Sequence, residues 1–177
     1  MLEREGPEAV SMRRIARELD MTPMALYHHF RNRQSLLNAV VDAEIERFAA
    51  MADRLRGTGG KRVQLTRVVD GYLDYALERP RVFDYVFNTR RPGARRYPQD
   101  FRARRSPSLN PVADDIAAEM RAGRLKRADQ WEIALQLWAQ VHGYVSLYRA
   151  GRFDLGEKEF RALYHRAVKR LLEGLQA

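Results

Sequence analysis

Donor side chains gather in a short stretch near the start of the chain. Tyr27, His28 and His29 follow one another, and Arg33 comes four residues later. Phenol, imidazole and guanidinium groups donate hydrogen bonds to phosphate oxygens and to acceptor atoms on base edges. Neighbouring helical residues point about 100° apart, and neither histidine has a carboxylate or cysteine four residues before it. The stretch therefore indicates recognition of a nucleic acid, with no metal and no cofactor.

Two short helices joined by a tight turn are expected to hold these donors. Ser11 is a favourable N-cap for the first, which ends near Leu19, and Asp20 tolerates the left-handed conformation that often ends a helix. Thr22 caps the second helix, and Pro23 suits its first position because that N–H would lack a partner anyway. The first helix has an apolar stripe at helical spacing, formed by Met12, Ile15, Ala16 and Leu19.

Helices joined by such a tight turn must cross steeply, as in the helix-turn-helix, whose second helix enters the DNA major groove by its N-terminal end. Apolar residues at that end could contact thymine methyl groups, and the donors could reach base edges or phosphates. The predicted DNA-binding residues are Ser11, Thr22, Pro23, Met24, Ala25, Tyr27, His28, His29 and Arg33. Helix-turn-helix units also occur as plain packing corners, and Tyr27 could be half-buried structure, so geometry alone leaves both alternatives open.

The net charge of +9 does not by itself indicate nucleic-acid binding. Residues 1–60 carry nine basic and nine acidic residues, whereas residues 61–127 carry sixteen basic and eight acidic residues. The excess therefore lies outside the helix-turn-helix. The sequence has no cysteine, no apolar run long enough to span a bilayer and no secretory signal. We therefore expect a cytoplasmic protein with no membrane contact.

Helical periodicity continues through most of the chain, and strand signals are nearly absent. We expect an all-α protein with a small helix-turn-helix domain at 1–56 and a second helical domain at 57–177, divided at the sequence GTGG (57–60). Further helices are expected at 33–56, 61–79, 110–122, 129–150 and 157–175, with a short one after Pro80. The arginine-rich stretch 88–108 is expected to be a loop with a helical turn around 99–104, serving as a solvated linker, a gate for an acidic effector or an extra phosphate contact.

The stretch SMRRIARELDMTPMALYHHFRNRQSLLNAVVD (11–42) resembles the signature of TetR-family transcriptional regulators. It has Ile15–Ala16, Leu26–Tyr27, His29–Phe30 and Leu36–Leu37 at the matching spacings. Residues 137–153 resemble a variant of the family's C-terminal domain with a Trp-x-x-x-His-Gly segment. The turn glycine is Asp20 here and the flanking lysine is Arg33, and both changes are physically tolerable.

The resemblance implies a ligand-responsive regulator, most often a repressor, that binds a palindromic operator as a homodimer and is released by a small hydrophobic or aromatic effector. It also implies a helix ahead of the motif, of which MLEREG would retain only the last turn. We favour a missing segment, and expect an exposed apolar patch over Ile15, Leu19 and Phe30 where that helix is absent.

The same resemblance implies a dimer built from the last two helices and an effector pocket among the middle ones. The helix at 129–150 independently supports the dimer, because it has more apolar surface than one core can cover. The predicted dimerisation residues are Trp131, Tyr144, Phe160, Tyr164, Val168, Leu171 and Leu172. The predicted effector-binding residues, which could equally be ordinary core, are Tyr72, Tyr75, Phe83, Phe87, Trp138, His142 and Tyr148.

Two other classes of protein remain as alternatives. One is a helical ligand-binding or interaction protein that does not bind DNA. The other is a helical enzyme, which the sequence disfavours because it has no nucleophile–base spacing and no phosphate-binding loop. Asp114 and Asp115 are better explained as first-turn acids that the helix dipole stabilises. We therefore expect no enzymatic activity.

Overall fold

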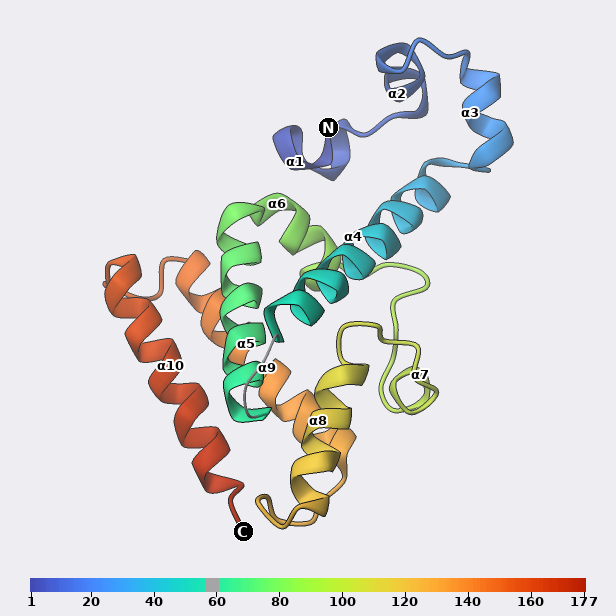
Figure 1. The fold of residues 1–177 in the computed structure, drawn as a ribbon. Helices are drawn as coiled ribbons and strands as arrows, with labels where there is room; N and C mark the ends of the chain where they lie inside the picture. Colours follow the sequence, from blue (N-terminus) through green and yellow to red (C-terminus); the bar gives the residue numbers. More distant parts are fainter. Residues whose placement is uncertain (57–60) are drawn as a thin grey trace.

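The computed structural model describes residues 1–56 and 61–177, and all regular elements within these ranges are helical (Figure 1). The predicted boundary at 57–60 lies outside the described residues, and the side chains of 61–63 are not described either. The elements are α1 (Leu2–Glu5), η1 (Pro7–Ala9), α2 (Met12–Glu18), α3 (Pro23–His29), α4 (Arg33–Arg56), α5 (Lys61–Glu78), α6 (Pro80–Phe83), η2 (Asp84–Asn88), α7 (Gln99–Arg102), α8 (Asn110–Arg121), α9 (Gln130–Arg149) and α10 (Glu157–Gly174).

Local capping forms the turn between α2 and α3 as the sequence predicts. The Ser11 hydroxyl accepts from the backbone N–H of Arg14, 3.1 Å away, at the start of α2. Asp20 has φ of 52°, and the following N–H of Met21 donates back to the Ala16 carbonyl over 2.8 Å, which satisfies a carbonyl of the last turn. The Thr22 hydroxyl then caps α3, with Pro23 in its first turn. Side-chain caps and backbone hydrogen bonds between residues close in sequence therefore set the reversal.

The long helix α4 joins the helix-turn-helix to the rest of the molecule (Figure 1). Asn32 caps it by accepting from the N–H of Ser35 over 2.8 Å. Its second half packs along α5, where Gly71 permits close approach because an added Cβ would collide with the Leu55 side chain. Buried Val41 and Phe48 belong to the same apolar core as residues of α5 and α9. A movement of α4 would therefore displace both α3 and residues of that core.

Helices α8, α9 and α10 complete the body of the protein. The Asp129 carboxylate caps α9 by accepting from the N–H groups of Trp131 and Glu132. Tyr164 of α10 is fully buried and donates its hydroxyl to the Val69 carbonyl of α5 over 2.9 Å, and burial raises the pKa of its phenol. The stretch after η2 is a long loop that contains α7, as expected for 88–108. Within the described residues, no helix is long and apolar enough to cross a membrane.

The first turn of the chain packs against the body, and its Glu5 side chain also pairs with Arg14 of α2 at 2.6 Å. Arg81, in α6, donates to the carbonyl of Arg4, and Arg79 pairs with Glu3 at 2.9 Å. The apolar patch expected on the helix-turn-helix is present at Leu19, whose side chain is 59% exposed. Ile15 is only half-buried by its neighbours, as is Phe30.

Candidate functional site

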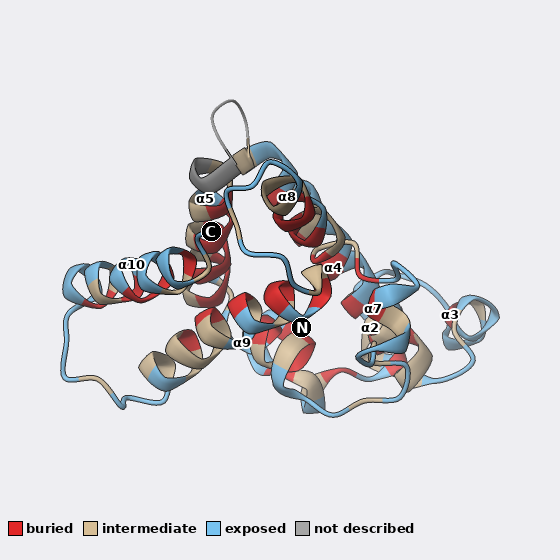
Figure 2. Cartoon of the chain, turned by 90° about the horizontal axis from the view of Figure 1, so that it is seen from below, coloured by how far each residue is buried: buried red, intermediate tan, exposed pale blue. Residues whose placement is uncertain are grey.

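Helix α3 stands at the edge of the molecule, far from α10, and most of its surface is exposed (Figure 2). Leu26 is its one buried residue and packs it against the rest of the helix-turn-helix. Met24 is 68% exposed and Tyr27 is 45% exposed, and both histidines are also on the surface. A helix held by a single anchor, with its first turn open, has the shape that enters a major groove.

The caps of the two helices are also accessible. Ser11 and Thr22 are exposed, and each hydroxyl accepts one backbone N–H while its own hydrogen remains available to donate. Pro23 is exposed beside them, whereas Ala25 is half-buried. These positions leave hydroxyl donors at the N-terminal ends of α2 and α3, where a phosphate is favourably placed.

Arg33 differs from the other predicted contact residues because its donors are already engaged within the protein. Its Nε donates to the Val10 carbonyl over 2.7 Å, and its Nη2 donates to the Pro7 carbonyl and lies 3.9 Å from Glu8. The guanidinium therefore ties the segment before α2 to the start of α4. Its position indicates a structural role, which the sequence pattern did not reveal.

Exposed arginines that the sequence analysis did not select lie near α3. Arg13 and Arg17 are exposed on α2 with i, i+4 spacing, and Arg31 is exposed just after α3. None of the three forms an ion pair with a residue that the structure describes. Arg14, by contrast, pairs with Glu5 at 2.6 Å. The free guanidinium groups near this surface are thus Arg13, Arg17 and Arg31, and helical spacing of basic residues was the signal that could have found them.

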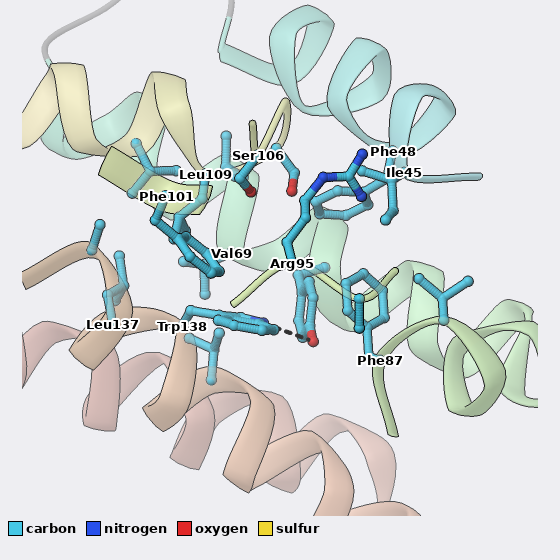
Figure 3. A pocket seen from close by; sticks show the side chains of 18 of the residues that line it. Ile45, Phe48, Val69, Phe87, Arg95, Phe101, Ser106, Leu109, Leu137 and Trp138 are labelled. Carbon is cyan, nitrogen blue, oxygen red and sulfur yellow. Dashed lines mark hydrogen bonds between the residues drawn. The ribbon is translucent and has the colours of Figure 1, made fainter. Parts of the chain in front are cut away.

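A cavity of about 200 Å³ lies in the body between α4, α5, α8 and α9 (Figure 3). Its wall is mostly apolar, with Phe48, Tyr72, Phe87, Phe101 and Trp138 as its aromatic members. The loop between η2 and α8 supplies polar groups, among them Arg95, which Figure 3 shows extending between Ser106 and Phe48. The cavity therefore combines a large apolar surface with a few polar groups on one side, as ligand sites commonly do.

One chain of hydrogen bonds begins at the cavity wall and continues into α9. The indole Nε1 of Trp138 donates to the Tyr72 hydroxyl over 3.2 Å, which the dashed line in Figure 3 marks. The Tyr72 hydroxyl lies 2.8 Å from Nδ1 of His142, and Nε2 of His142 lies 3.3 Å from the Ser146 hydroxyl. Since an indole only donates, the Tyr72 oxygen accepts from Trp138. A neutral His142 with its proton on Nε2 fits both of its contacts, because Nδ1 then accepts the Tyr72 hydrogen and Nε2 donates to Ser146.

The electrostatic environment agrees with a neutral imidazole. Burial lowers the pKa of His142, against a smaller opposing effect of the Asp84 carboxylate. Burial likewise raises the pKa of the Tyr72 hydroxyl above its usual value. Asp84 itself is paired with Arg149 at 2.5 Å, and that hydrogen bond lowers the pKa of the Asp84 carboxyl. The chain of hydrogen bonds from Trp138 through Tyr72 and His142 to Ser146 thus contains no charged group, and its members serve as each other's hydrogen-bond partners.

Three of the seven predicted effector residues line the cavity, and four lie elsewhere. Tyr72, Phe87 and Trp138 are in its wall. The other four have different environments: Tyr75 donates to Glu44 over 3.1 Å, Phe83 is fully buried, His142 lies behind Tyr72, and Tyr148 stacks on Phe160 with ring centroids 3.9 Å apart. The aromatic residues of the sequence indicated the part of the protein in which the cavity lies. The sequence alone could not distinguish the residues that line the cavity from the core residues behind them.

The predicted dimerisation residues are mostly buried within the single chain. Five of them pack inside the protomer, and these are Trp131, Phe160, Tyr164, Val168 and Leu172. Tyr144 and Leu171 are only partly buried. The reason is that α10 covers its stripe by packing on α9 and α5. The outward surface of α9 is formed by other residues, namely Gln136, Ala139, Gly143 and Leu147, and it has no charged group between 135 and 147.

A buried charge network joins the helix-turn-helix side of the molecule to the body. Glu44 of α4 is only 6% exposed, and it accepts from Tyr75 over 3.1 Å and from Arg79 over 2.5 Å. Arg79 also donates to Glu3 of α1 over 2.9 Å. The hydrogen bond to Glu3 and the charge of Glu44 raise the pKa of the Arg79 guanidinium, so the network stays charged. One arginine thus holds α1, α4 and the α5–α6 corner together.

Family models match both ends of the chain. Residues 1–40 match the model described as bacterial regulatory proteins, tetR family. Residues 65–171 match the model described as tetracyclin repressor-like, C-terminal domain. The first match covers the helix-turn-helix, and the second covers most of the residues that line the cavity, except those of α4.

Individual proteins agree with these matches. The HTH-type transcriptional regulator Rv0681 of Mycobacterium tuberculosis (strain ATCC 25618 / H37Rv) is 27% identical over 176 residues, which cover 99% of this chain and 76% of that protein. The HTH-type transcriptional repressor KstR of Mycolicibacterium smegmatis is 35% identical over 74 residues, which cover 42% of this chain and 36% of that protein. A solved structure from Rhodococcus sp. RHA1 has the same fold, with a TM-score of 0.82 and 24% identity over 99% of this chain and 89% of that chain.

Proposed function

This chain belongs to the TetR family of transcriptional regulators, and from that premise we propose that it is a repressor that binds a palindromic operator and releases it when a small molecule enters the cavity. The proteins of this family are DNA-binding regulators and not enzymes. The observation that carries the proposal is the pairing of an exposed α3 with a cavity whose wall includes residues of α4, the helix that begins next to α3.

The proposed DNA contacts follow from exposure and chemistry. Met24 and Tyr27 face solvent at the first turns of α3, where major-groove contacts are made. The Ser11 and Thr22 hydroxyls and the free guanidinium groups of Arg13, Arg17 and Arg31 would hold the phosphates on either side, and His28 and His29 add donors near them. Arg33 supports this surface from behind through its bonds to the Val10 and Pro7 carbonyls.

The proposed effector response uses α4 as the moving part. Ile45 and Phe48 of α4 form part of the cavity wall, and Glu44 beside them is bonded to Tyr75 and Arg79 of the body. A ligand that displaces this section of α4 would also displace α3, which changes the separation of two recognition helices in a dimer. A ligand that prefers the displaced state by about 1–3 kcal/mol would lower DNA affinity by 5- to 150-fold.

A homodimer is proposed through the outward face of α9 together with α10. Gln136, Ala139 and Leu147 are exposed along one side of α9, and an added Cβ at Gly143 would meet no atom within 4 Å in the protomer. Small and uncharged residues on one exposed helix face let a second helix approach closely, and two-fold pairing would place two α3 helices on one duplex.

Selection of duplexes from a random pool by the purified chain tests this function. We expect enrichment of a palindrome with half-sites that fit successive major grooves, and an affinity that falls steeply as salt increases. The proposal is wrong if no sequence is enriched and no duplex is bound at low ionic strength. In that case the chain would be a ligand-binding protein without DNA binding.

A further inference from the structure

An arginine at the cavity has no partner. Arg91 lines the cavity, its Nε is buried without a hydrogen-bond partner, and the guanidinium forms no hydrogen bond or ion pair with the residues at 1–56 and 61–177 that the structure describes. Buried polar groups in folded proteins are nearly always hydrogen-bonded, and a buried charge is paired. An unpaired guanidinium at a ligand cavity therefore calls for a partner that the chain itself does not provide.

The neighbouring arginine shows the contrast. Arg95 also lines the cavity, but it lies 3.3 Å from the Asp42 carboxylate and donates its Nε to the Arg105 carbonyl. Its charge is thus balanced within the protein. Burial lowers the pKa of Arg91, the positive charge of Arg95 acts in the same direction, and Asp42 opposes both. A guanidinium keeps its proton in proteins, so Arg91 brings to the cavity a positive charge that no carboxylate of the described residues pairs with directly.

The apolar lining and the volume of the cavity indicate what the remainder of the ligand must be. Phe87, Phe101 and Trp138 form a broad apolar wall. A cavity of about 150 Å³ lined by apolar side chains accommodates benzene, so the 200 Å³ here has room for a substituted ring or a short alkyl chain. Ser106 and Ser108 line the same cavity as Arg91, and their hydroxyl groups can share the hydrogen bonding of a polar head.

Building on the proposed effector role of this cavity, we propose that its ligand is an amphipathic monocarboxylate, with its carboxylate on Arg91 and its apolar body between Phe87, Phe101 and Trp138. A carboxylate presents two oxygens that match the fork of a guanidinium. A single negative charge balances the single unpaired arginine. An uncharged ligand would leave the positive charge of Arg91 unpaired, with its Nε buried.

Binding of matched acids and amides tests this inference. The probes are phenylacetate, 3-phenylpropanoate, hexanoate and octanoate, each compared with its primary amide, which keeps the size and removes the charge. Binding is measured by calorimetry and by the fluorescence of Trp138, with Trp131 as the other indole. We expect at least one acid to bind ten or more times as tightly as its amide.

Three variants locate the charge recognition. Arg91→Met removes the guanidinium but keeps an apolar stem, and we expect the acid to bind no better than its amide. Arg91→Lys should restore part of the preference. Arg90→Met is the matched control, because Arg90 is exposed on the same segment and its loss changes the net charge equally. Arg91→Met should also raise the melting temperature of the ligand-free protein, since it removes an unpaired charge.

The outcomes separate this inference from the proposed function. It is wrong if no acid of the series binds more tightly than its amide, or if Arg91→Met leaves the preference unchanged. A fall in the melting temperature of Arg91→Met would also contradict it, because that would show an internal partner for Arg91. Operator binding is measured without any probe, so a protein that prefers the acid but binds no duplex would keep this inference and reject the repressor.

Discussion

The Tyr72 hydroxyl lies 2.8 Å from Nδ1 of His142 and accepts the indole N–H of Trp138, so one tyrosine connects the cavity wall to the interior of α9. The arrangement explains why tryptophan and histidine occur four residues apart in α9. They lie on the same side of the helix, where one supplies a donor and the other an acceptor to the same hydroxyl. The pair fixes Tyr72 at the point where a ligand would touch it.

Tyr72→Phe should destabilise the protein by about 1–3 kcal/mol, because the Trp138 N–H and Nδ1 of His142 would both lose their partner. Chemical denaturation measures the change. Tyr85→Phe is the matched control, since Tyr85 is equally buried and its hydroxyl has no hydrogen bond within the described part of the chain. Equal effects of the two substitutions would show that the hydrogen-bond chain contributes nothing to stability.

The neutral state of His142 predicts that mild acid weakens the fold. Burial lowers its pKa in the folded protein, so below pH 6.5 the unfolded chain binds more protons than the folded one. The free energy of unfolding should therefore fall as the pH decreases below about 6.5, by less than about 1.4 kcal/mol per pH unit because the site is only partly buried. His142→Gln should remove this slope in unfolding experiments, and an unchanged slope would assign the effect to another group.

The helix-turn-helix was predictable to the residue because its signals are local. Ser11, Asp20, Thr22 and Pro23 each specify a backbone conformation through contacts within a few positions. The exposure of α3 follows from its having only Leu26 as an anchor. Such caps and turns need no knowledge of the rest of the fold.

The cavity wall and the burial of α10 were less predictable because long-range packing decides them. A stripe such as that of α10 shows that a helix face is buried, but not whether its neighbour is in the same chain, and here α9 and α5 cover it. Arg91 lies in an aperiodic loop, so only the fold brings it to the cavity that Trp138 also lines. Arg33 matched a phosphate-contact position by type, yet its donors are used by Val10 and Pro7.

Arg79, which joins α1, α4 and the body, should contribute strongly to the stability of the fold. Arg79→Met leaves the buried Glu44 carboxylate without its closest cation, and we expect a loss of about 2–3 kcal/mol in unfolding free energy. This loss of unfolding free energy is smaller than that expected for a buried charge with no partner at all, because Tyr75 and Arg47 still bond to Glu44. Combining it with Glu44→Gln should cost less than the sum of the two single changes, and strict additivity would show that the pair is not coupled.

The exposed arginines of α2 predict a specific change in salt dependence. Arg13→Ala and Arg17→Ala should each weaken binding to all duplexes and reduce the slope of log affinity against log salt by about 1, because each removes one phosphate contact. Fluorescence anisotropy on one selected duplex and one unrelated duplex measures both effects. Arg33→Ala should instead lower the melting temperature, since its bonds hold the segment before α2. If only Arg33→Ala changes the salt slope, the assignment of contacts is reversed.

Ala139→Lys should convert the proposed dimer to a monomer without unfolding the chain. Ala139 lies in the uncharged outward strip of α9, where two facing lysines would repel each other across a two-fold axis and would have to be desolvated. Ala43→Lys is the control, because Ala43 is also exposed on a helix but lies on α4. Light scattering gives the mass and circular dichroism confirms the fold. A dimer of unchanged stability with lysine at 139 would move the interface away from this face of α9, and operator affinity should fall together with dimerisation because each half-site alone is bound weakly.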